Sequence, residues 1–197
     1  DDDPEEVAGS VGRIATAMGL RLLDAQGQDV PLGQEGEICA EGPSLHLGYH
    51  ANPTANAEAF TADGWFRTGD LGFIDPRGNL RISGRVKEMI NRGGKKFFPR
   101  EIEEVLYTHP AILYCAIVGL PDARLGERAC LCLVPRAGHP VPDLAAIIAF
   151  MGDGWATYKL PERLVVMDEL PFTPTGKIQR HKLAQAILAR DQQENQQ

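Results

Sequence analysis

The sequence predicts an α+β protein with a small β-rich subdomain over residues 1–85, followed by a compact α+β domain over residues 86–190 that has a small sheet and about three helices. Turn signals and short extended runs dominate the first part. Apolar β-rich runs alternate with amphipathic segments in the second part. The length of 197 residues suffices for one domain or two small ones. The polar residues 191–197 are predicted to be a disordered tail.

In the first part, residues 20–23 and 37–40 are short extended runs that predict strands. Residues 24–27 (Asp-Ala-Gln-Gly) and 75–78 (Asp-Pro-Arg-Gly) are typical of turns between strands. Helix is predicted only at residues 54–60. The first part is therefore expected to be a small β subdomain.

The second part begins with a predicted helix at Pro99, because proline is favoured in a first helical turn. Ile102, Val105 and Leu106 follow at helical spacing and form one apolar face. Pro110 stops the pattern. A short amphipathic helix is therefore expected here.

Two apolar runs at residues 113–119 and 129–134 predict strands, with a turn at Pro121 and Asp122 between them. Residues 163–167 predict a further strand. These strands are expected to form the small sheet of the second part.

Two more helices complete the second part. Asp143 is a candidate N-cap of a helix that ends at Gly152 and Gly154. Apolar residues spaced from Leu183 to Leu188 predict the last helix. Strand and helix thus alternate, which favours a compact α+β domain.

The charge balance argues against nucleic-acid binding, because the formal net charge is -7 and phosphate backbones are held by Lys and Arg. Residues 85–100 differ, with six basic residues and one acidic residue, a local balance of 6 − 1 = +5. This segment favours a compact anionic ligand, although a solvated basic face fits it as well. The cations are Arg85, Lys87, Arg92, Lys95, Lys96 and Arg100.

The sequence gives no sign of a membrane span, because no stretch approaches the roughly 20 apolar residues needed. The acidic N-terminus is unlike a signal peptide. The cysteines Cys39, Cys115, Cys130 and Cys132 lack zinc-ligand spacing, so no metal site is predicted on them. Cys130 and Cys132 should share one face of a strand. Buried, reduced thiols and a cytoplasmic location are expected.

Three clusters carry residues suited to chemistry. The first, Phe-Arg-Thr-Gly-Asp-Leu at residues 66–71, favours a tight turn on spacing alone, with the carboxylate bonded to its own backbone. The second, residues 84–96, joins cations to the pair Gly93 and Gly94. Paired glycines let a ligand approach the backbone amides, but a hairpin turn flanked by surface cations fits equally.

The third cluster is the loop at residues 170–178, which is restrained by prolines and by Gly176. Lys177 sits on this projecting loop just before the last predicted helix. A lysine held there can place a point charge against a phosphate. The alternative is an ordinary solvent-exposed lysine.

The order and spacing of these clusters resemble the adenylate-forming superfamily of acyl-CoA synthetases, adenylation domains and luciferases. Residues 66–71 resemble the family's Tyr/Phe-Arg-Thr-Gly-Asp motif. Residues 84–94, together with residues 101–103, resemble its hinge-and-loop motif. Residues 174–178 resemble its C-terminal lysine motif. Residues 119–122 and 125–128 also match acyl-CoA ligases. The resemblance extends from Gly12 to about Leu188.

The resemblance implies two half-reactions in one site. A carboxylate attacks the α-phosphate of ATP to give acyl-AMP and pyrophosphate, and after rotation of a mobile C-terminal domain the thiol of CoA attacks the acyl-adenylate. By position, the implied catalytic residue is Lys177, the nucleotide-binding residues are Asp70, Arg85 and Lys96, the hinge is Lys87, and the CoA-binding residues are Gly93, Gly94, Lys95, Tyr158 and Lys159.

The family's Ser/Thr/Gly-rich phosphate loop and its aromatic-Gly-x-Thr-Glu segment do not occur in the sequence. The resemblance therefore implies that an N-terminal part of the protein is missing here, which mostly holds ATP and Mg²⁺ and carries most of the acyl pocket. The chain alone is expected to be inactive. The acid is expected to be a short- or medium-chain fatty, alicyclic or aromatic acid.

The chain reads Gly93-Gly94-Lys95-Lys96 where many acyl-CoA ligases read Gly-Gly-Glu-Asn. The two extra cations favour an anionic acceptor or simply face solvent. Two other functions stay open: an adenylation enzyme that loads the phosphopantetheine of a carrier protein, and a non-catalytic interaction domain.

Overall fold

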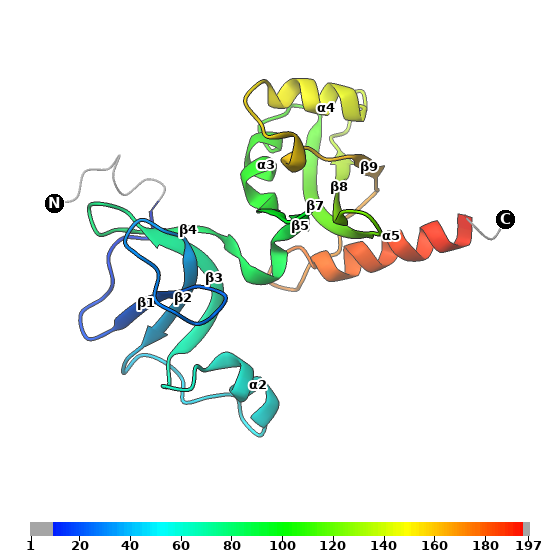
Figure 1. Cartoon of the computed structure of the whole chain (residues 1–197). Coiled ribbons are helices and arrows are strands. Elements are labelled where there is room, and N and C mark those ends of the chain that lie inside the picture. The colour runs from blue at the N-terminus through cyan, green and yellow to red at the C-terminus, as the bar shows by residue number, and fades with distance from the viewer. Residues whose placement is uncertain (1–9, 195–197) are drawn as a thin grey trace. The chain divides into compact units, whose positions relative to one another are not determined.

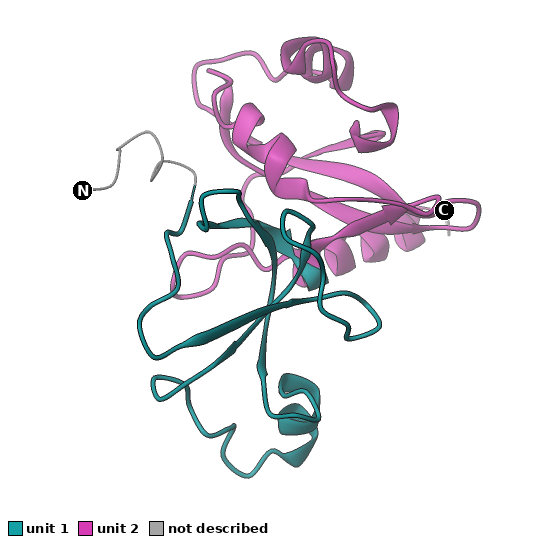
Figure 2. Ribbon diagram, turned by 60° about the vertical axis from the view of Figure 1, so that its left-hand side comes forward, with its two compact units in different colours: residues 1–87 teal, residues 88–197 magenta. Residues whose placement is uncertain are grey.

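The structure, a computed structural model, describes residues 10–194, which divide into two compact units at the boundary between Lys87 and Glu88. Figure 2 colours the two units separately. The acidic N-terminus considered above and residues 195–197 lie outside the described residues.

The first unit is built on an antiparallel four-stranded sheet in which each strand pairs with the next along the chain. Its elements are β1 (Gly19–Leu23), β2 (Gly36–Glu41), α2 (Pro53–Ala59), β3 (Phe66–Ile74) and β4 (Leu80–Arg85), all labelled in Figure 1. The strands predicted at 20–23 and 37–40 and the helix predicted at 54–60 are present.

The two predicted turns of this unit are present and are closed by aspartates. The Asp24 Oδ1 atom accepts the amides of Gln26 and Gln28 at 2.8 and 2.9 Å. In the β3–β4 turn, Asp75 Oδ1 accepts the amides of Arg77 and Asn79 at 3.0 and 2.9 Å. Such side-chain acceptors stabilise the turn without a glycine at every position.

Asp75 gives a testable pH dependence. The Asn79 amide and the Arg81 guanidinium, which donates to Oδ2 at 3.1 Å, hold the pKa of the Asp75 carboxyl below its ordinary value. When the pKa of a carboxyl group is lower in the folded than in the unfolded protein, the ionised group stabilises the fold at pH values above its unfolded-state pKa. This stabilisation is lost as the pH falls through the folded-state pKa. Urea unfolding should therefore show Asp75→Ala less stable than wild type at pH 7, with the gap narrowing below about pH 4. A gap that is constant with pH would contradict the ionic part of this account.

The second unit contains a five-stranded mixed sheet. Strand β8 (Gly126–Pro135) pairs antiparallel with β7 (Ile112–Asp122) and β5 (Ile90–Arg92), and parallel with β9 (Arg163–Val166). The edge strand β6 (Lys95–Phe97) pairs with β5. The helices are α3 (Pro99–Leu106), α4 (Leu144–Met151) and α5 (Arg180–Glu194), with 3₁₀ turns η1 (Val86–Glu88) and η2 (Thr157–Lys159).

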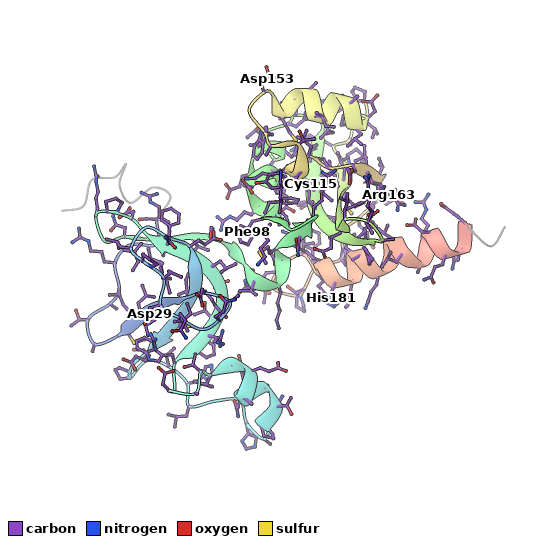
Figure 3. All side chains as sticks on the ribbon, in the orientation of Figure 1. Asp29, Phe98, Cys115, Asp153, Arg163 and His181 are labelled. Carbon is purple, nitrogen blue, oxygen red and sulfur yellow. The ribbon has the colours of Figure 1, made fainter. Side chains whose placement is uncertain are left out.

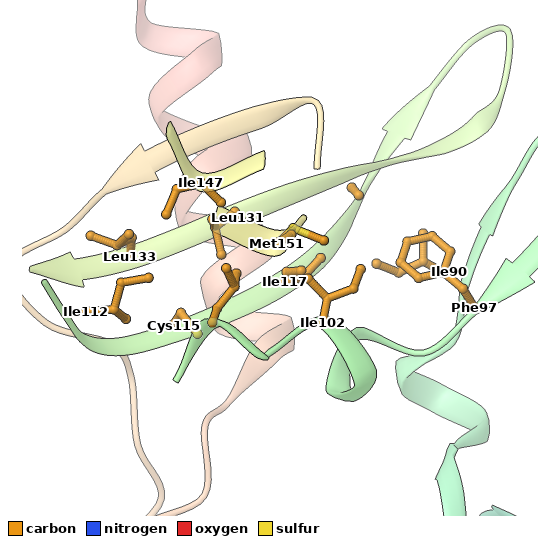
Figure 4. Packing of buried hydrophobic residues seen from close by; sticks show 12 residues of the cluster. Ile90, Phe97, Ile102, Ile112, Cys115, Ile117, Leu131, Leu133, Ile147 and Met151 are labelled. Carbon is orange, nitrogen blue, oxygen red and sulfur yellow. The ribbon is translucent and has the colours of Figure 1, made fainter. Parts of the chain in front are cut away.

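Helices cover both faces of the β7–β8 hairpin. Leu131 and Leu133 pack in one core with Ile102 of α3 and Ile147 of α4, as the close-up in Figure 4 shows. Residues of opposite parity pack in a second core with α5, whose buried side chains are Leu183 and Ile187. A strand buried on both faces reads as a continuous apolar run, which explains why residues 113–119 and 129–134 show no alternation. The α+β fold predicted from the sequence is confirmed.

The second core also contains Cys130 and Cys132, which share a face of β8 as predicted. Cys39 and Cys115 are buried as well, and all four thiols are free. Figure 3 labels Cys115 in the interior of the second unit. Burial raises the pKa of Cys39 to about 11 and that of Cys115 to about 12, so both stay protonated near neutral pH.

The turn predicted at Pro121 and Asp122 is wrong, because both residues belong to β7 and pair with Glu127 and Gly126 of β8. The chain reverses at residues 123–125 instead. Asp122 Oδ1 accepts the Leu125 amide at 2.8 Å, so the aspartate caps the turn from the end of its strand.

The disordered tail predicted from residue 191 is also wrong for its first four residues, because α5 continues to Glu194. Asp191 accepts two bonds from the Arg163 guanidinium, at 2.5 and 2.6 Å. Arg163 lies on β9 and is labelled in Figure 3. A bidentate pair of this kind fixes the last helical turns to the sheet.

No helix between residues 10 and 194 is long and apolar enough to cross a membrane.

Candidate functional site

The first cluster, residues 66–71, lies in β3 and is not the tight turn that its spacing favours. Cys39 faces Arg67 and Glu37 faces Leu71, so residues 68–70 form a bulge opposite the single residue Ile38. Gly69 has φ +73°, which explains the glycine at this position. Thr68 Oγ1 donates to the Ile38 carbonyl at 2.8 Å and accepts the Asp70 amide at 3.1 Å. A bulge re-aims the side chains beside it, here that of Asp70.

Asp70 and Arg85 face each other across β3 and β4, and Arg85 Nε donates to Asp70 Oδ1 at 2.7 Å. The Asp70 side chain is 27% exposed and that of Arg85 is 52% exposed. The structure therefore brings together two of the three predicted nucleotide-binding residues. A carboxylate oriented in this way and open to solvent is suited to accept charge-assisted bonds from neighbouring hydroxyl groups.

Lys87, the predicted hinge, lies in the 3₁₀ turn η1 and is the last residue of the first unit. Its side chain is exposed. Strand β4 ends at Arg85 and β5 begins at Ile90, so no strand spans the boundary between the units. The hinge role stays a prediction.

Gly93 and Gly94 form the two-residue turn between β5 and β6, in which Arg92 faces Lys95. Their φ angles are +60° and +83°, the left-handed values that a two-residue hairpin turn needs at both positions. The hairpin considered for the second cluster is thus present. The Gly93 amide donates to the Leu125 carbonyl at 2.7 Å, whereas a Cβ on Gly94 would meet no atom within 4 Å. Gly94 therefore presents open backbone.

The residues predicted to bind CoA gather partly around this hairpin. The Lys95 Nζ atom lies 5.2 Å from the centroid of the Tyr158 ring, a cation–π contact, and Tyr158 also packs edge-on against Phe97. Lys159 is engaged by Glu101, with 2.6 Å between Nζ and Oε2. Lys96 is exposed and points to the opposite side of β6 from Lys95, so the structure does not bring Lys96 into this group.

Arg92 belongs to this site although the sequence indicated only its charge. Its Nη1 atom donates to the Thr157 carbonyl at 3.0 Å, and its Nη2 atom lies 2.5 Å from Glu162 Oε1. Arg92 thereby fixes the η2 segment, which carries Tyr158, beside the glycine hairpin. The hydrogen bond from Arg92 to Thr157 joins residues 65 positions apart in the sequence, so no local sequence pattern predicts it.

Lys177 lies on the restrained loop that its motif predicts. The Thr173 amide donates to the Lys177 carbonyl at 2.7 Å, the Lys177 amide donates to Thr173 Oγ1 at 3.0 Å, and Gly176 has φ +80°. The Lys177 side chain is exposed, and it forms no ion pair within residues 10–194. The loop therefore presents an exposed cation on a hydrogen-bonded backbone, which is suited to binding an anionic ligand.

No three His, Cys, Asp or Glu side chains among the described residues are grouped so that they could hold a metal ion. Asp70, the carboxylate of the first cluster, is engaged by Arg85.

Comparison with known proteins places this geometry in a family. The model of the AMP-binding enzyme C-terminal domain matches residues 101–177, and the model of the AMP-binding enzyme matches residues 1–50. The chain belongs to the AMP-binding, adenylate-forming enzyme family. The resemblance of the sequence to this family is thus confirmed.

Relatives in this family are similar to the chain over most of its length. The probable CoA ligase CCL9 of Humulus lupulus is 40% identical over 188 residues, and triostin synthetase I of Streptomyces triostinicus is 43% identical over 184 residues. The alignments cover 94% and 92% of this chain but 35% of each relative. The chain thus spans about a third of the length of these relatives.

A solved structure of this family also matches. The crystal structure of ATP-bound MatB from Rhodopseudomonas palustris is 32% identical, with a TM-score of 0.82 over 90% of this chain and 35% of that one. The family fold is therefore shared at the level of backbone as well as sequence.

Proposed function

We propose that the chain is the C-terminal portion of an AMP-forming acid–CoA ligase. Its second unit carries two separate surfaces with different chemistry: the exposed Lys177 loop, and the open Gly93–Gly94 hairpin beside Tyr158. This pairing on one compact unit is the observation that carries the proposal. A unit that serves two successive half-reactions needs one surface for each.

In the proposed first half-reaction, a carboxylate oxygen of the substrate attacks the α-phosphorus of ATP, and the bond from that phosphorus to the pyrophosphate oxygen breaks. The Lys177 ammonium stabilises the negative charge shared by the carboxylate and the phosphate. Asp70 accepts hydrogen bonds from the two ribose hydroxyls, while Arg85 orients the Asp70 carboxylate and holds the nucleotide. ATP, and Mg²⁺ with it, are proposed to be held mainly by an N-terminal part outside this chain.

In the proposed second half-reaction, the thiolate of CoA attacks the acyl carbonyl carbon and AMP leaves with the electrons of the carbon–oxygen bond. The pantetheine arm lies along the Gly93–Gly94 backbone, because Gly94 leaves open space where any other residue has a Cβ. Lys95 and Tyr158 flank the arm. Lys159 can reach a CoA phosphate only if its ion pair with Glu101 breaks. Lys96, on the other side of β6, is proposed to contact the bound nucleotide.

The proposed change between the two half-reactions is a rotation of the second unit about Lys87.

We also propose that the enzyme works in the cytoplasm, because all four cysteines are free thiols and none forms a disulfide within residues 10–194.

A carrier-protein acceptor is the second candidate. Triostin synthetase I, which is 43% identical, is not named as a CoA ligase, and the 40% identity to the probable CoA ligase CCL9 is similar, so the relatives leave this candidate open. Both acceptors present the same phosphopantetheine thiol, so the hairpin fits either one.

Mass spectrometry of products from the full-length enzyme tests the proposal. The enzyme is incubated with ATP and a panel of fatty, alicyclic and aromatic acids, with either CoA or a set of phosphopantetheinylated carrier proteins. The proposed function requires an acyl-CoA product. Acylated carrier protein without acyl-CoA would support the second candidate, and neither product with any acid would contradict both.

Gly94→Ala tests the second half-reaction. The φ of +83° is strained for alanine, and the new Cβ occupies space proposed for the pantetheine arm. Thioester formation from supplied acyl-AMP should fall roughly ten- to a hundredfold. Stopped assays of acyl-AMP consumption with CoA measure it.

Gly138→Ala is the matched control, because Gly138 also has a positive φ of +82° and open space at its Cβ but lies in the loop after β8. The control should keep wild-type thioester formation. Equal losses in both variants would mean that backbone strain, and not contact with the acceptor, explains the effect.

A further inference from the structure

A partly buried guanidinium follows the Lys177 loop in the sequence. Arg180 is the first residue of α5, and its side chain is 20% exposed. Its Nη1 and Nη2 atoms donate to the two oxygens of Glu103 at 2.5 and 2.8 Å. Nη1 also donates to the Ile117 carbonyl at 3.1 Å, and Nε lies 3.3 Å from Glu88 Oε2. One side chain therefore ties the start of α5 to α3, to β7 and to the residue that follows Lys87.

Glu103 is a demanding partner because it is buried, with 7% of its side chain exposed. It accepts the Ile117 amide at 2.6 Å in addition to the Arg180 pair. Burial disfavours the charged guanidinium, yet the Glu103 and Glu88 carboxylates outweigh it and the pKa of Arg180 is raised. A buried pair with this many bonds has one favoured geometry, since any displacement leaves a charge without partners.

The Lys177 loop is closed on itself. The Gln179 amide donates to the Pro171 carbonyl at 2.7 Å, the Gln179 side chain donates to the Phe172 carbonyl at 2.8 Å, and Phe172 pairs with Ile178. These bonds all lie within the loop, and none of them joins it to the sheet. Apolar contacts of Leu170 and Ile178 are non-directional. Phe172 also packs edge-on against Tyr114 of β7, with 5.3 Å between the ring centroids. The charged, hydrogen-bonded link from the end of the loop to the body of the unit is the Arg180 guanidinium, three residues after Lys177.

We propose that Arg180 is a positioning residue for Lys177, and that Glu103 holds it in place. The inference rests on the proposed role of Lys177 in adenylation. It adds that the direction of the lysine loop is set by the ion pair between the buried Glu103 and the partly buried Arg180, 77 residues apart in sequence. The same guanidinium anchors Glu88 next to the proposed hinge. The loop and the residue after the hinge thus share one anchor.

Hydrogen exchange of the chain tests the positioning directly, without any activity. Arg180→Lys keeps a charge for Glu103, so the fold should survive, but a single ammonium cannot bond Glu103 bidentately and also reach Ile117 and Glu88. We expect the loop amides of Thr173, Gly176, Lys177 and Gln179 to exchange about tenfold faster or more, with the β7–β8 amides unchanged. Arg190→Lys is the matched control, because Arg190 lies on the same helix and pairs with Glu194 in solvent.

Unchanged loop exchange in Arg180→Lys would overturn the inference. Faster exchange of the β7–β8 amides to the same extent would overturn it as well, because Arg180 would then serve the stability of the whole unit. A loop-specific increase with no change in Arg190→Lys supports it.

A double-mutant cycle in the full-length enzyme supplies the link to function. Arg180→Lys should lower adenylation about tenfold or more in the wild-type background and change it little in the Lys177→Ala background, because positioning a side chain that is absent has no effect. Equal losses in both backgrounds would refute positioning. If the wild-type enzyme showed no adenylation, the proposed function would be contradicted. The positioning role of Arg180 would still be tested by the hydrogen-exchange experiment.

Discussion

Lys177→Ala should abolish most adenylation by the full-length enzyme while leaving thioester formation from supplied acyl-AMP close to wild type. The expected loss in ATP–pyrophosphate exchange is about 10²- to 10³-fold, the usual effect of removing one positioned charge from a transition state. The reason is chemical: negative charge accumulates between carboxylate and α-phosphate only in the first half-reaction. Exchange of labelled pyrophosphate into ATP measures the first half, and acyl-AMP consumption with CoA measures the second.

Lys182→Ala is the control for this prediction. Lys182 is also exposed and lies five residues further along, in the first turns of α5, but outside the closed loop. Its removal should leave both half-reactions near wild type. If Lys177→Ala and Lys182→Ala behaved alike, surface charge and not a positioned cation would explain the effect, and a non-catalytic role for the unit would gain support.

Lys87→Pro should produce the opposite pattern, with adenylation retained and thioester formation reduced by roughly 10²-fold. Proline fixes its own φ, and it also disfavours the helical conformation of the preceding residue, here Val86 in the 3₁₀ turn η1. Because the carboxylate is activated before the proposed rotation, only the second half-reaction depends on a changed backbone at this position. Single-turnover assays of each half-reaction measure the split.

Lys87→Ala separates backbone from side chain at the same position. It removes the exposed ammonium but leaves the dihedral angles free, so both half-reactions should persist. Full thioester formation by Lys87→Pro would place the hinge elsewhere, and a large loss in Lys87→Ala would assign the side chain a direct role.

The elements that the sequence predicted well are those set by local chemistry. Helix α3 starts at Pro99, as expected, because proline suits a first helical turn. Asp143 caps α4 by accepting the Ala146 amide at 2.8 Å. Gly176, with its positive φ, sits in the turn of the lysine loop that the prolines and glycine predicted.

The features that were missed depend on partners far along the chain. Thr-Gly-Asp at 68–70 forms a strand bulge because Ile38 lies opposite it, which no local turn propensity records. Helix α5 runs past residue 191 because Arg163, 28 residues away, pairs with Asp191. The Glu103–Arg180 pair joins residues 77 apart, so the anchor of the lysine loop was invisible in the loop's own sequence. Candidate site residues could thus be named from the sequence by residue type, whereas the residues that hold them in place could not.

The central claim is that Lys177 serves the first half-reaction and the Gly93–Gly94 hairpin the second. Rapid-quench measurement of both half-reactions in full-length Lys177→Ala and Gly94→Ala enzymes, prepared side by side, tests it most directly. The account predicts a crossed pattern, in which Lys177→Ala loses acyl-AMP synthesis and keeps thioester formation while Gly94→Ala does the reverse. Equal loss of both half-reactions in both variants would contradict it.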